Sequence, residues 1–250
     1  DGQLELSNTT SWGVSTRMIG GVIMVHGDDD GLRVPPRIAP WQVVIVPMLR
    51  DAPEDEEIIA YCKALQADLA AQSALGEPVR ALLDLKFGKA AAKRWGWVKK
   101  GAPVIVEVGG RDVAGGNVSV VRRDRLYRAD GKLDSQILPR GDFVSGAAAM
   151  LEDIQRSLHN QARERLRANV APAVDFAAVE EHFAEGAKNP GWLEVQWSRP
   201  SGAALDKVVE RLKALKLTLR NAPMEQRVAD GACVFTGDAA VERVLIGRAY

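Results

Sequence analysis

Cysteine and histidine are scarce in this 250-residue sequence, which contains two cysteines, Cys62 and Cys233, and three histidines. The two cysteines lie far apart and have no partners at the spacing of a metal site, so the sequence predicts neither a disulfide framework nor a zinc centre. Such sparse use of cysteine is typical of proteins in a reducing compartment, and we expect a cytoplasmic protein.

Long apolar runs and an excess of one charge are also absent. The best apolar run, residues 43–49, is interrupted by Pro47 and is too short to cross a bilayer, and no secretory signal is visible at the start. We therefore expect no contact with a membrane. Lys and Arg together number 33, as do Asp and Glu, so a strongly basic nucleic-acid footprint is excluded globally and any basic surface must be local.

What the sequence does contain is an apolar fraction of 46%, enough for a substantial core. The first part, residues 1–39, predicts the end of a strand at 3–11 and a helix over 17–26, with Ser15 and Thr16 as N-cap candidates. Residues 26–40, rich in Asp, Gly and Pro, predict a turn and a linker, and we place a domain boundary there.

Residues 40–142 predict an α/β domain with a mostly parallel sheet. The apolar, β-branched run at 41–48 is typical of a strand buried on both faces. Helices and strands alternate after this run: helix 54–74, strand 78–86, helix 89–99, strand 103–109 and a strand within 111–123. We interpret the glycines of 109–116 as a hairpin turn.

Residues 143–250 predict a long amphipathic helix followed by a small α+β domain. The helix covers 143–169, with Ile154, Leu158 and Leu166 on its apolar stripe. The expected later elements are helix 175–185, strand 192–198, helix 202–215, and strands 217–219, 232–236 and 243–250.

Arg17, at the first turn of the predicted helix 17–26, is one candidate for binding chemistry. A guanidinium beside the positive end of a helix dipole suits a polyphosphate, although the motif taken alone favours an ordinary surface arginine with a capping Ser. The following HGDDDG stretch, residues 26–31, could hold a cation, but no bidentate Glu follows at the spacing of a calcium loop, so we favour a solvated turn.

Basic residues are interleaved with aromatic ones in KFGKAAAKRWGWVKKG, residues 86–101. Cations neutralise phosphates and flat rings stack on bases, so this composition fits single-stranded nucleic acid. The candidate contacts are Lys86, Lys93, Arg94 and Lys100. The alternative is a solvated helix face whose Trp95 and Trp97 fill the core.

Several blocks together resemble prolyl-tRNA synthetases of the archaeal/eukaryotic-like type. The most specific is TSWGVSTRMIGGVIMVHGDDDGLRVPPRIAPWQVVIVP at 10–47, which is similar to the family's motif 3 and its connection to the anticodon-binding domain. KGAPVIVEVGGRD, VRRD, LEDIQRSLHNQARE and the final GRAY continue the resemblance in order, so that it spans essentially the whole chain.

The resemblance implies the C-terminal part of a class II enzyme that activates proline with ATP and transfers it to tRNA(Pro). It implies that Arg17 contacts ATP and stabilises the transition state, that Ser15 also touches ATP, and that residues 1–39 end a catalytic domain whose other motifs lie upstream. It further implies ATP with Mg²⁺, L-proline and tRNA(Pro) as partners, a homodimer at full length, and no activity for these 250 residues alone.

The sequence also departs from the family pattern. Leu85 and Val98 stand where relatives carry an arginine and an acidic residue, and Ala92-Lys93-Arg94 replaces a W-K-F/Y pattern. Relatives often bind a structural zinc on four cysteines, but the corresponding positions here are Ser198, Ala203, Cys233 and Thr236, so we expect no zinc. These departures leave open a non-enzymatic, synthetase-derived RNA-binding or interaction protein; an unrelated nucleotide-binding domain would need a phosphate loop that the sequence lacks.

Overall fold

The computed structural model describes residues 9–86, 88–184, 186 and 190–248. The chain divides into two compact units, Asp1–Ala162 and Arg163–Tyr250, each of which is described by itself. Most of the strand expected at 3–11, and the last two residues of the strand expected at 243–250, fall outside the described residues. Residues 9–11 form no strand.

The first unit begins with helix α1 (Arg17–His26), as the sequence predicts. The predicted cap is not formed, because neither hydroxyl closes the helix start; the amides of Met18 and Ile19 instead bond the carbonyls of Ser15 and Thr16 at 3.1 and 3.0 Å. The expected turn after α1 is a short hairpin of β1 (Gly27–Asp28) and β2 (Gly31–Leu32).

A five-stranded mixed sheet forms the centre of this unit, in the order β6-β3-β7-β8-β9. β3 (Val43–Pro47) lies between β6 (Ala81–Leu83) and β7 (Val104–Val108), and all three are parallel. β8 (Asn117–Arg122) and β9 (Ser135–Pro139) continue the sheet antiparallel. The predicted α/β class is confirmed.

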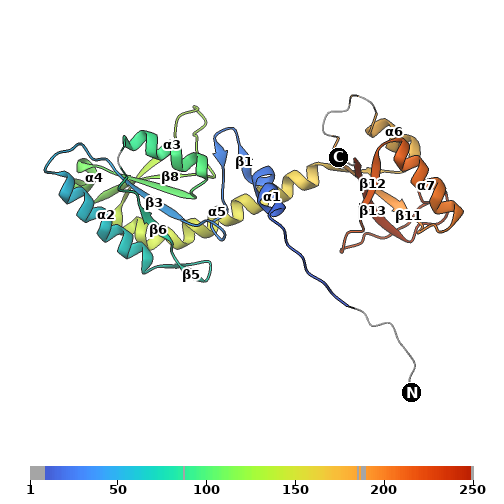
Figure 1. Ribbon diagram of the computed structural model, residues 1–250, viewed down its shortest axis with the longest axis horizontal. Helices are drawn as coiled ribbons and strands as arrows, with labels where there is room; N and C mark the ends of the chain where they lie inside the picture. The colour runs from blue at the N-terminus through green and yellow to red at the C-terminus, as the bar shows by residue number, and fades with distance from the viewer. Residues whose placement is uncertain (1–8, 87, 185, 187–189, 249–250) are drawn as a thin grey trace, which may run out of the picture. The chain divides into compact units, whose positions relative to one another are not determined.

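Helices cover both faces of the sheet, and α2 and α3 lie on opposite sides of it in Figure 1. Successive side chains of a strand point to opposite faces, so Val43 and Ile45 pack with α2 (Asp55–Ala70), while Val44 and Val46 pack with α3 (Ala90–Lys100). All five residues of β3 are buried, as the apolar run predicts.

The glycines of 109–116 do not form the predicted hairpin turn. They flank a short helix, α4 (Gly110–Gly115), because the Asp112 carboxylate accepts the Gly109 N–H at 2.8 Å and closes the helix start. β6 lies within the strand expected at 78–86. A small hairpin of β4 (Ser73–Ala74) and β5 (Glu77–Pro78) precedes it, and β4 occupies the end of the helix expected at 54–74.

Helix α5 (Arg140–Ala168) starts directly after β9, and the boundary between the two units falls within it. Its buried residues in the first unit lie at helical spacing beside the α2 face of the sheet: Phe143, Ala147, Leu151, Ile154 and Leu158. Leu166, expected on the same stripe, is 59% exposed, so the predicted stripe is wrong at its last member.

The second unit contains a four-stranded sheet in the order β10-β11-β13-β12. Its strands are β10 (Val170–Ala173), β11 (Trp192–Trp197), β12 (Leu217–Asn221) and β13 (Glu242–Arg248), and its helices are α6 (Phe176–His182) and α7 (Ala203–Ala214). This is the α+β arrangement that the sequence predicts.

The strand expected at 232–236 is wrong. These residues form a tight turn in which the Cys233 N–H bonds the Asp238 carbonyl at 2.7 Å and the Gly237 N–H bonds the Cys233 carbonyl at 2.9 Å. Cys233, Val234 and Phe235 are nevertheless buried, so the apolar run fills the core of the unit without pairing as a strand.

Candidate functional site

Two of the four predicted RNA contacts are held inside the protein. Lys93 is 9% exposed at its side chain, and its Nζ donates a 2.5 Å hydrogen bond to the carbonyl of Asp84 at the end of β6. Nη1 of Arg94 donates to both carboxylate oxygens of Glu107, on β7, at 3.0 and 2.7 Å. Lys93 and Arg94 therefore join α3 to the sheet.

The other two predicted contacts, Lys86 and Lys100, are exposed. Lys86 follows β6, and its backbone N–H donates to Oδ1 of Asp84 at 3.0 Å. Lys100 is the last residue of α3, and its ammonium lies 4.5 Å from the centre of the Trp97 ring, within the range of a cation–π contact. Each of these lysines lines a cavity together with Trp97 of α3.

Two cavities share the indoles of Trp41 and Trp97. The larger, of about 520 Å³, is lined by Trp41, Leu82, Leu83, Asp84, Leu85, Lys86 and Trp97. The smaller, of about 260 Å³, is lined by Val34, Ala39, Pro40, Trp41, Trp97, Lys100, Gly101 and Ala102. Each cavity therefore combines flat rings with one exposed cation, which suits a base and its phosphate.

Trp41 and Asp84 are site residues that sequence reasoning missed. Trp41 was assigned to the buried strand, yet it is 41% exposed and precedes β3. Asp84 accepts the Trp97 Nε1–H at 2.8 Å on Oδ2 and fixes the indole plane. Burial opposes ionisation of Asp84, but the hydrogen bonds from Trp97 and Lys86 and the nearby Lys93 outweigh it and hold the pKa of Asp84 below its usual value.

Arg17 and Ser15, the predicted ATP contacts, lie in the first unit outside both cavities. Both are exposed, and α1 has no buried residue among the described ones. Several apolar side chains of α1 are more than half exposed: Met18, Ile19, Ile23 and Met24. A helix with this much exposed apolar surface is typical of one that packs against a further part of a protein.

The turn after α1 exposes Asp28 and Asp29 to solvent, as expected for a solvated turn, but two of its carboxylates also have partners within the protein. The Asp28 carboxylate pairs with the buried guanidinium of Arg123 at 2.5 and 2.8 Å, and Oδ1 of Asp30 accepts the Tyr127 hydroxyl at 2.9 Å. Because the carboxylate oxygens of Asp28 and Asp30 already accept hydrogen bonds, fewer of their lone pairs remain to coordinate a cation. Over the described residues, no group of three or more His, Cys, Asp or Glu side chains is placed to hold a metal.

Three of the four positions expected to align with zinc ligands do meet in the second unit. The Ser198 and Thr236 hydroxyl oxygens lie 3.1 Å apart, and both residues hydrogen-bond the Cys233 thiol; Ala203 is exposed at the start of α7. Burial opposes ionisation of Cys233, but these hydroxyls and the amides of Phe235 and Thr236 lower the pKa of its thiol. One thiol and two hydroxyls do not fit the four nitrogen or sulfur ligands of a structural zinc.

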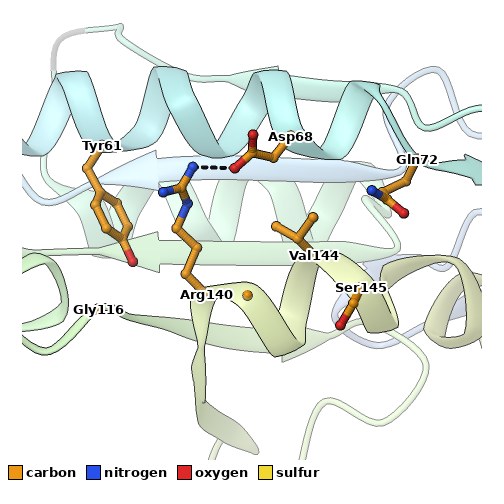
Figure 2. Close-up of a pocket in the computed structure, with 8 residues that line it drawn as sticks. Tyr61, Asp68, Gln72, Gly116, Arg140, Val144 and Ser145 are labelled. Atoms are coloured by element: carbon orange, nitrogen blue, oxygen red, sulfur yellow. Dashed lines mark hydrogen bonds and ion pairs between the residues drawn. The ribbon is translucent and has the colours of Figure 1, made fainter.

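A further cavity, of about 450 Å³, lies between α2 and the start of α5 (Figure 2). Arg140 forms an ion pair with Asp68 there, and its guanidinium lies 5.0 Å from the Tyr61 ring. The Tyr61 hydroxyl donates to the carbonyl of Asn117 at 2.9 Å. The polar groups of this cavity therefore join α2 to α5 and to β8.

Comparison with known proteins defines the class first. Residues 42–138 match the family model "Anticodon binding domain". They contain α3 and all but the last residue of the five-stranded sheet, and they supply most of the lining of the larger cavity and half of that of the smaller one, while Trp41 directly precedes the match. The fold and the match together define an anticodon-binding domain of the kind found in aminoacyl-tRNA synthetases.

The particular family follows from relatives that match the whole chain. A "Proline--tRNA ligase" of Sphingomonas elodea is 68% identical over 251 residues, covering 100% of this chain and 49% of the relative. Proteins of the same name from Sphingopyxis alaskensis and Novosphingobium aromaticivorans are 64% and 56% identical, with all of this chain and 47% and 49% of the relatives covered. The chain belongs to the proline–tRNA ligase family, which confirms the resemblance, and it spans about half the length of these relatives.

Proposed function

We propose that the chain is the C-terminal, tRNA-binding part of a proline–tRNA ligase, which activates L-proline with ATP and transfers it to tRNA(Pro). The observation that carries the proposal is the pair of cavities lined by Trp41 and Trp97, beside Lys86 and Lys100, which the matched anticodon-binding domain forms together with the residues just before it. Because the relatives carry the ligase name, a non-enzymatic RNA-binding protein is not favoured.

In this proposal the anticodon loop lies against the C-terminal half of α3. Unpaired bases stack on the exposed parts of the two indoles, while Lys86 and Lys100 neutralise the neighbouring phosphates. Lys93 and Arg94 contribute indirectly, because they hold the strand ends and the helix that present Asp84 and Trp97. The charge balance of the chain supports a local surface of this kind over a basic face of large extent.

Arg17 and Ser15 are proposed to contact ATP within the catalytic domain that the preceding half of the enzyme completes. The exposed apolar side chains of α1 support this, since burying them against that domain would remove them from water. A guanidinium there would stabilise the charge that develops on the α-phosphate when proline attacks and pyrophosphate leaves. Mg²⁺ would accompany ATP in the full-length enzyme, which we propose to be a cytoplasmic homodimer. Among the helices of the described residues, none has the length and apolarity to cross a bilayer.

Proline-dependent exchange between ATP and pyrophosphate tests the proposal. We expect the full-length protein to catalyse exchange with proline and to charge tRNA(Pro), and the 250 residues alone to catalyse neither. Arg17→Ala should reduce exchange by about 100-fold or more, the loss typical of one group that stabilises transition-state charge. Arg50→Ala, an exposed arginine outside α1, is the matched control. A full-length protein that exchanges no pyrophosphate with proline would contradict the proposal.

A further inference from the structure

Arg123 directly follows β8, and its guanidinium forms several hydrogen bonds although the proposed chemistry gives it no role. It is 2% exposed, and its Nε donates to the carbonyl of Val98, in α3, at 3.0 Å. Nη1 and Nη2 donate to the two carboxylate oxygens of Asp28 at 2.8 and 2.5 Å. A bidentate pair of this kind is short and fixed in direction, so one side chain joins α3 to the hairpin that follows α1.

A second group of contacts holds the same hairpin. The Tyr127 hydroxyl donates to Oδ1 of Asp30 at 2.9 Å, and Nη1 of Arg33 donates to Oε1 of Gln161 at 2.9 Å. Arg33 Nε lies 3.5 Å from Asp28 Oδ2, which places a second cation on the carboxylate. Burial opposes ionisation of Asp28, but Arg123 and the further contacts outweigh it and lower its pKa, so the pair is charged at neutral pH.

The hairpin also lies directly on the last turn of α3, where two glycines permit the approach. Gly31 has a φ of 127°, and a Cβ on it would lie 2.6 Å from the Cα of Lys99. Gly101, the left-handed cap of α3 with a φ of 81°, would place a Cβ 2.6 Å from the Leu32 carbonyl oxygen. The Val34 N–H donates to the Gly101 carbonyl at 3.1 Å. The turn that carries Lys100 is therefore in backbone contact with the hairpin.

Helix α1 joins this hairpin without a linker, because α1 ends at His26 and β1 begins at Gly27. Since α1 buries none of its own residues within the described part of the chain, its direction relative to the anticodon-binding domain depends on how the hairpin is held. The strongest charged link between the hairpin and the anticodon-binding domain is the pair of Asp28 with Arg123.

We propose that Arg123 is a positioning residue: through Asp28 it clamps the hairpin to α3 and thereby fixes α1, with Arg17, relative to the helix turn that presents Trp97 and Lys100. This rests on the proposed function, in which Arg17 contacts ATP and α3 contacts tRNA. The clamp then acts on ATP use while leaving the RNA surface in place, since the hydrogen bond of Arg123 to α3 ends on the backbone carbonyl of Val98, and Arg123 lines neither cavity.

The test compares three variants of the full-length protein. Asp28→Asn keeps the shape of the side chain and removes its charge, and Tyr127→Phe removes only the hydroxyl that bonds Asp30, so it decides the outcome if Asp28→Asn does not fold. Glu242→Gln is the matched control, because Glu242 forms an equally bidentate pair with Arg199, at 2.7 and 2.8 Å, in the second unit. The readouts are KM for ATP in proline-dependent exchange, Kd for tRNA(Pro), and hydrogen exchange of the α1 and α3 amides.

We expect Asp28→Asn to raise KM for ATP roughly tenfold and Tyr127→Phe two- to threefold, as small displacements of a reacting group do, with Kd for tRNA within twofold of wild type. Amides of α1 should exchange faster while those of α3 do not change, and Glu242→Gln should leave all readouts unchanged. If folded variants of an active enzyme keep the wild-type KM for ATP and the wild-type hydrogen exchange of the α1 amides, the proposal that Arg123 clamps the hairpin is overturned. If the wild type shows no exchange of pyrophosphate, the proposed function fails, and hydrogen exchange alone decides whether Arg123 holds α1.

Discussion

The indole of Trp97 donates a 2.8 Å hydrogen bond to Oδ2 of Asp84, which joins α3 to the end of β6 through a ring that lines two cavities. The same carboxylate accepts the Lys86 backbone N–H at 3.0 Å on its other oxygen. One buried acid therefore fixes the plane of the indole and the path of the chain that carries Lys86.

Replacing this acid changes how stability depends on pH. The pKa of Asp84 is lowered in the folded protein, so its ionised form contributes stability that is fully present above the unfolded value, near pH 4, and is lost as pH falls through the lower folded value. We expect Asp84→Asn to unfold about 1–3 kcal/mol more easily at pH 7, the cost of losing a charge-assisted hydrogen bond. Urea unfolding from pH 7 to pH 3 should show the two proteins converging as pH falls; a constant difference would contradict this.

Arg94 and Glu107 form an ion pair that is strongly buried on the carboxylate side, with Glu107 8% exposed at its side chain. Arg94→Met leaves that carboxylate without a partner, and we expect a loss of about 3–5 kcal/mol in the free energy of unfolding. The double variant Arg94→Met/Glu107→Leu should recover most of the loss. Arg199→Met, which breaks an exposed pair, is the control and should cost less than about 1 kcal/mol. Equal losses in both single variants would exclude a special role for burial.

Cys62 is fully buried in α2, and burial raises the pKa of its thiol to about 12. Only the thiolate reacts readily with alkylating reagents, so we expect Cys62 to stay unmodified by iodoacetamide at pH 8 in the native protein and to react once the protein is unfolded in guanidinium. Peptide mass spectrometry measures both states. Rapid alkylation under native conditions would show that α2 opens far more often than its packing implies.

The second unit is expected to fold without zinc. Its Cys233 thiol is held by Ser198, Thr236 and two backbone amides, and the surrounding apolar core includes Trp197, Val234 and Ile246. Metal analysis of the purified full-length protein should find less than stoichiometric zinc, and a chelator should leave the unfolding temperature unchanged. One zinc per chain, or a chelator-dependent loss of stability, would contradict this.

The sequence predicts the sheet better than the partners of its charged residues. Burial of β3 on both faces requires an unbroken apolar run, and such a run is visible at Val43–Pro47. The partners of Lys93 and Arg94 are not visible in the same way, because Asp84 and Glu107 approach α3 only when strands and helix fold together. For the same reason, the pairing of Asp28 with Arg123 could not be read from the HGDDDG stretch.

Short elements were missed where side-chain capping or tertiary contacts decide the conformation. Helix α4 depends on the Asp112 cap in a glycine-rich segment that otherwise favours a turn. β9 and β10 went unpredicted because Ser135–Pro139 is largely exposed and Val170–Ala173 contains a proline, so neither shows the apolar pattern of a strand.

The salt dependence of tRNA(Pro) binding tests the central claim most directly. In the full-length protein, Lys86→Ala/Lys100→Ala should weaken binding roughly tenfold and reduce the slope of log K against log salt by about one to two, because each cation that contacts a phosphate contributes close to one. The control Lys207→Ala/Lys213→Ala, which removes two exposed lysines of α7, should leave affinity and slope unchanged. If the slope of the Lys86 and Lys100 variant equals that of the wild type, the surface around Trp41 and Trp97 does not bind the RNA backbone, and the account is wrong.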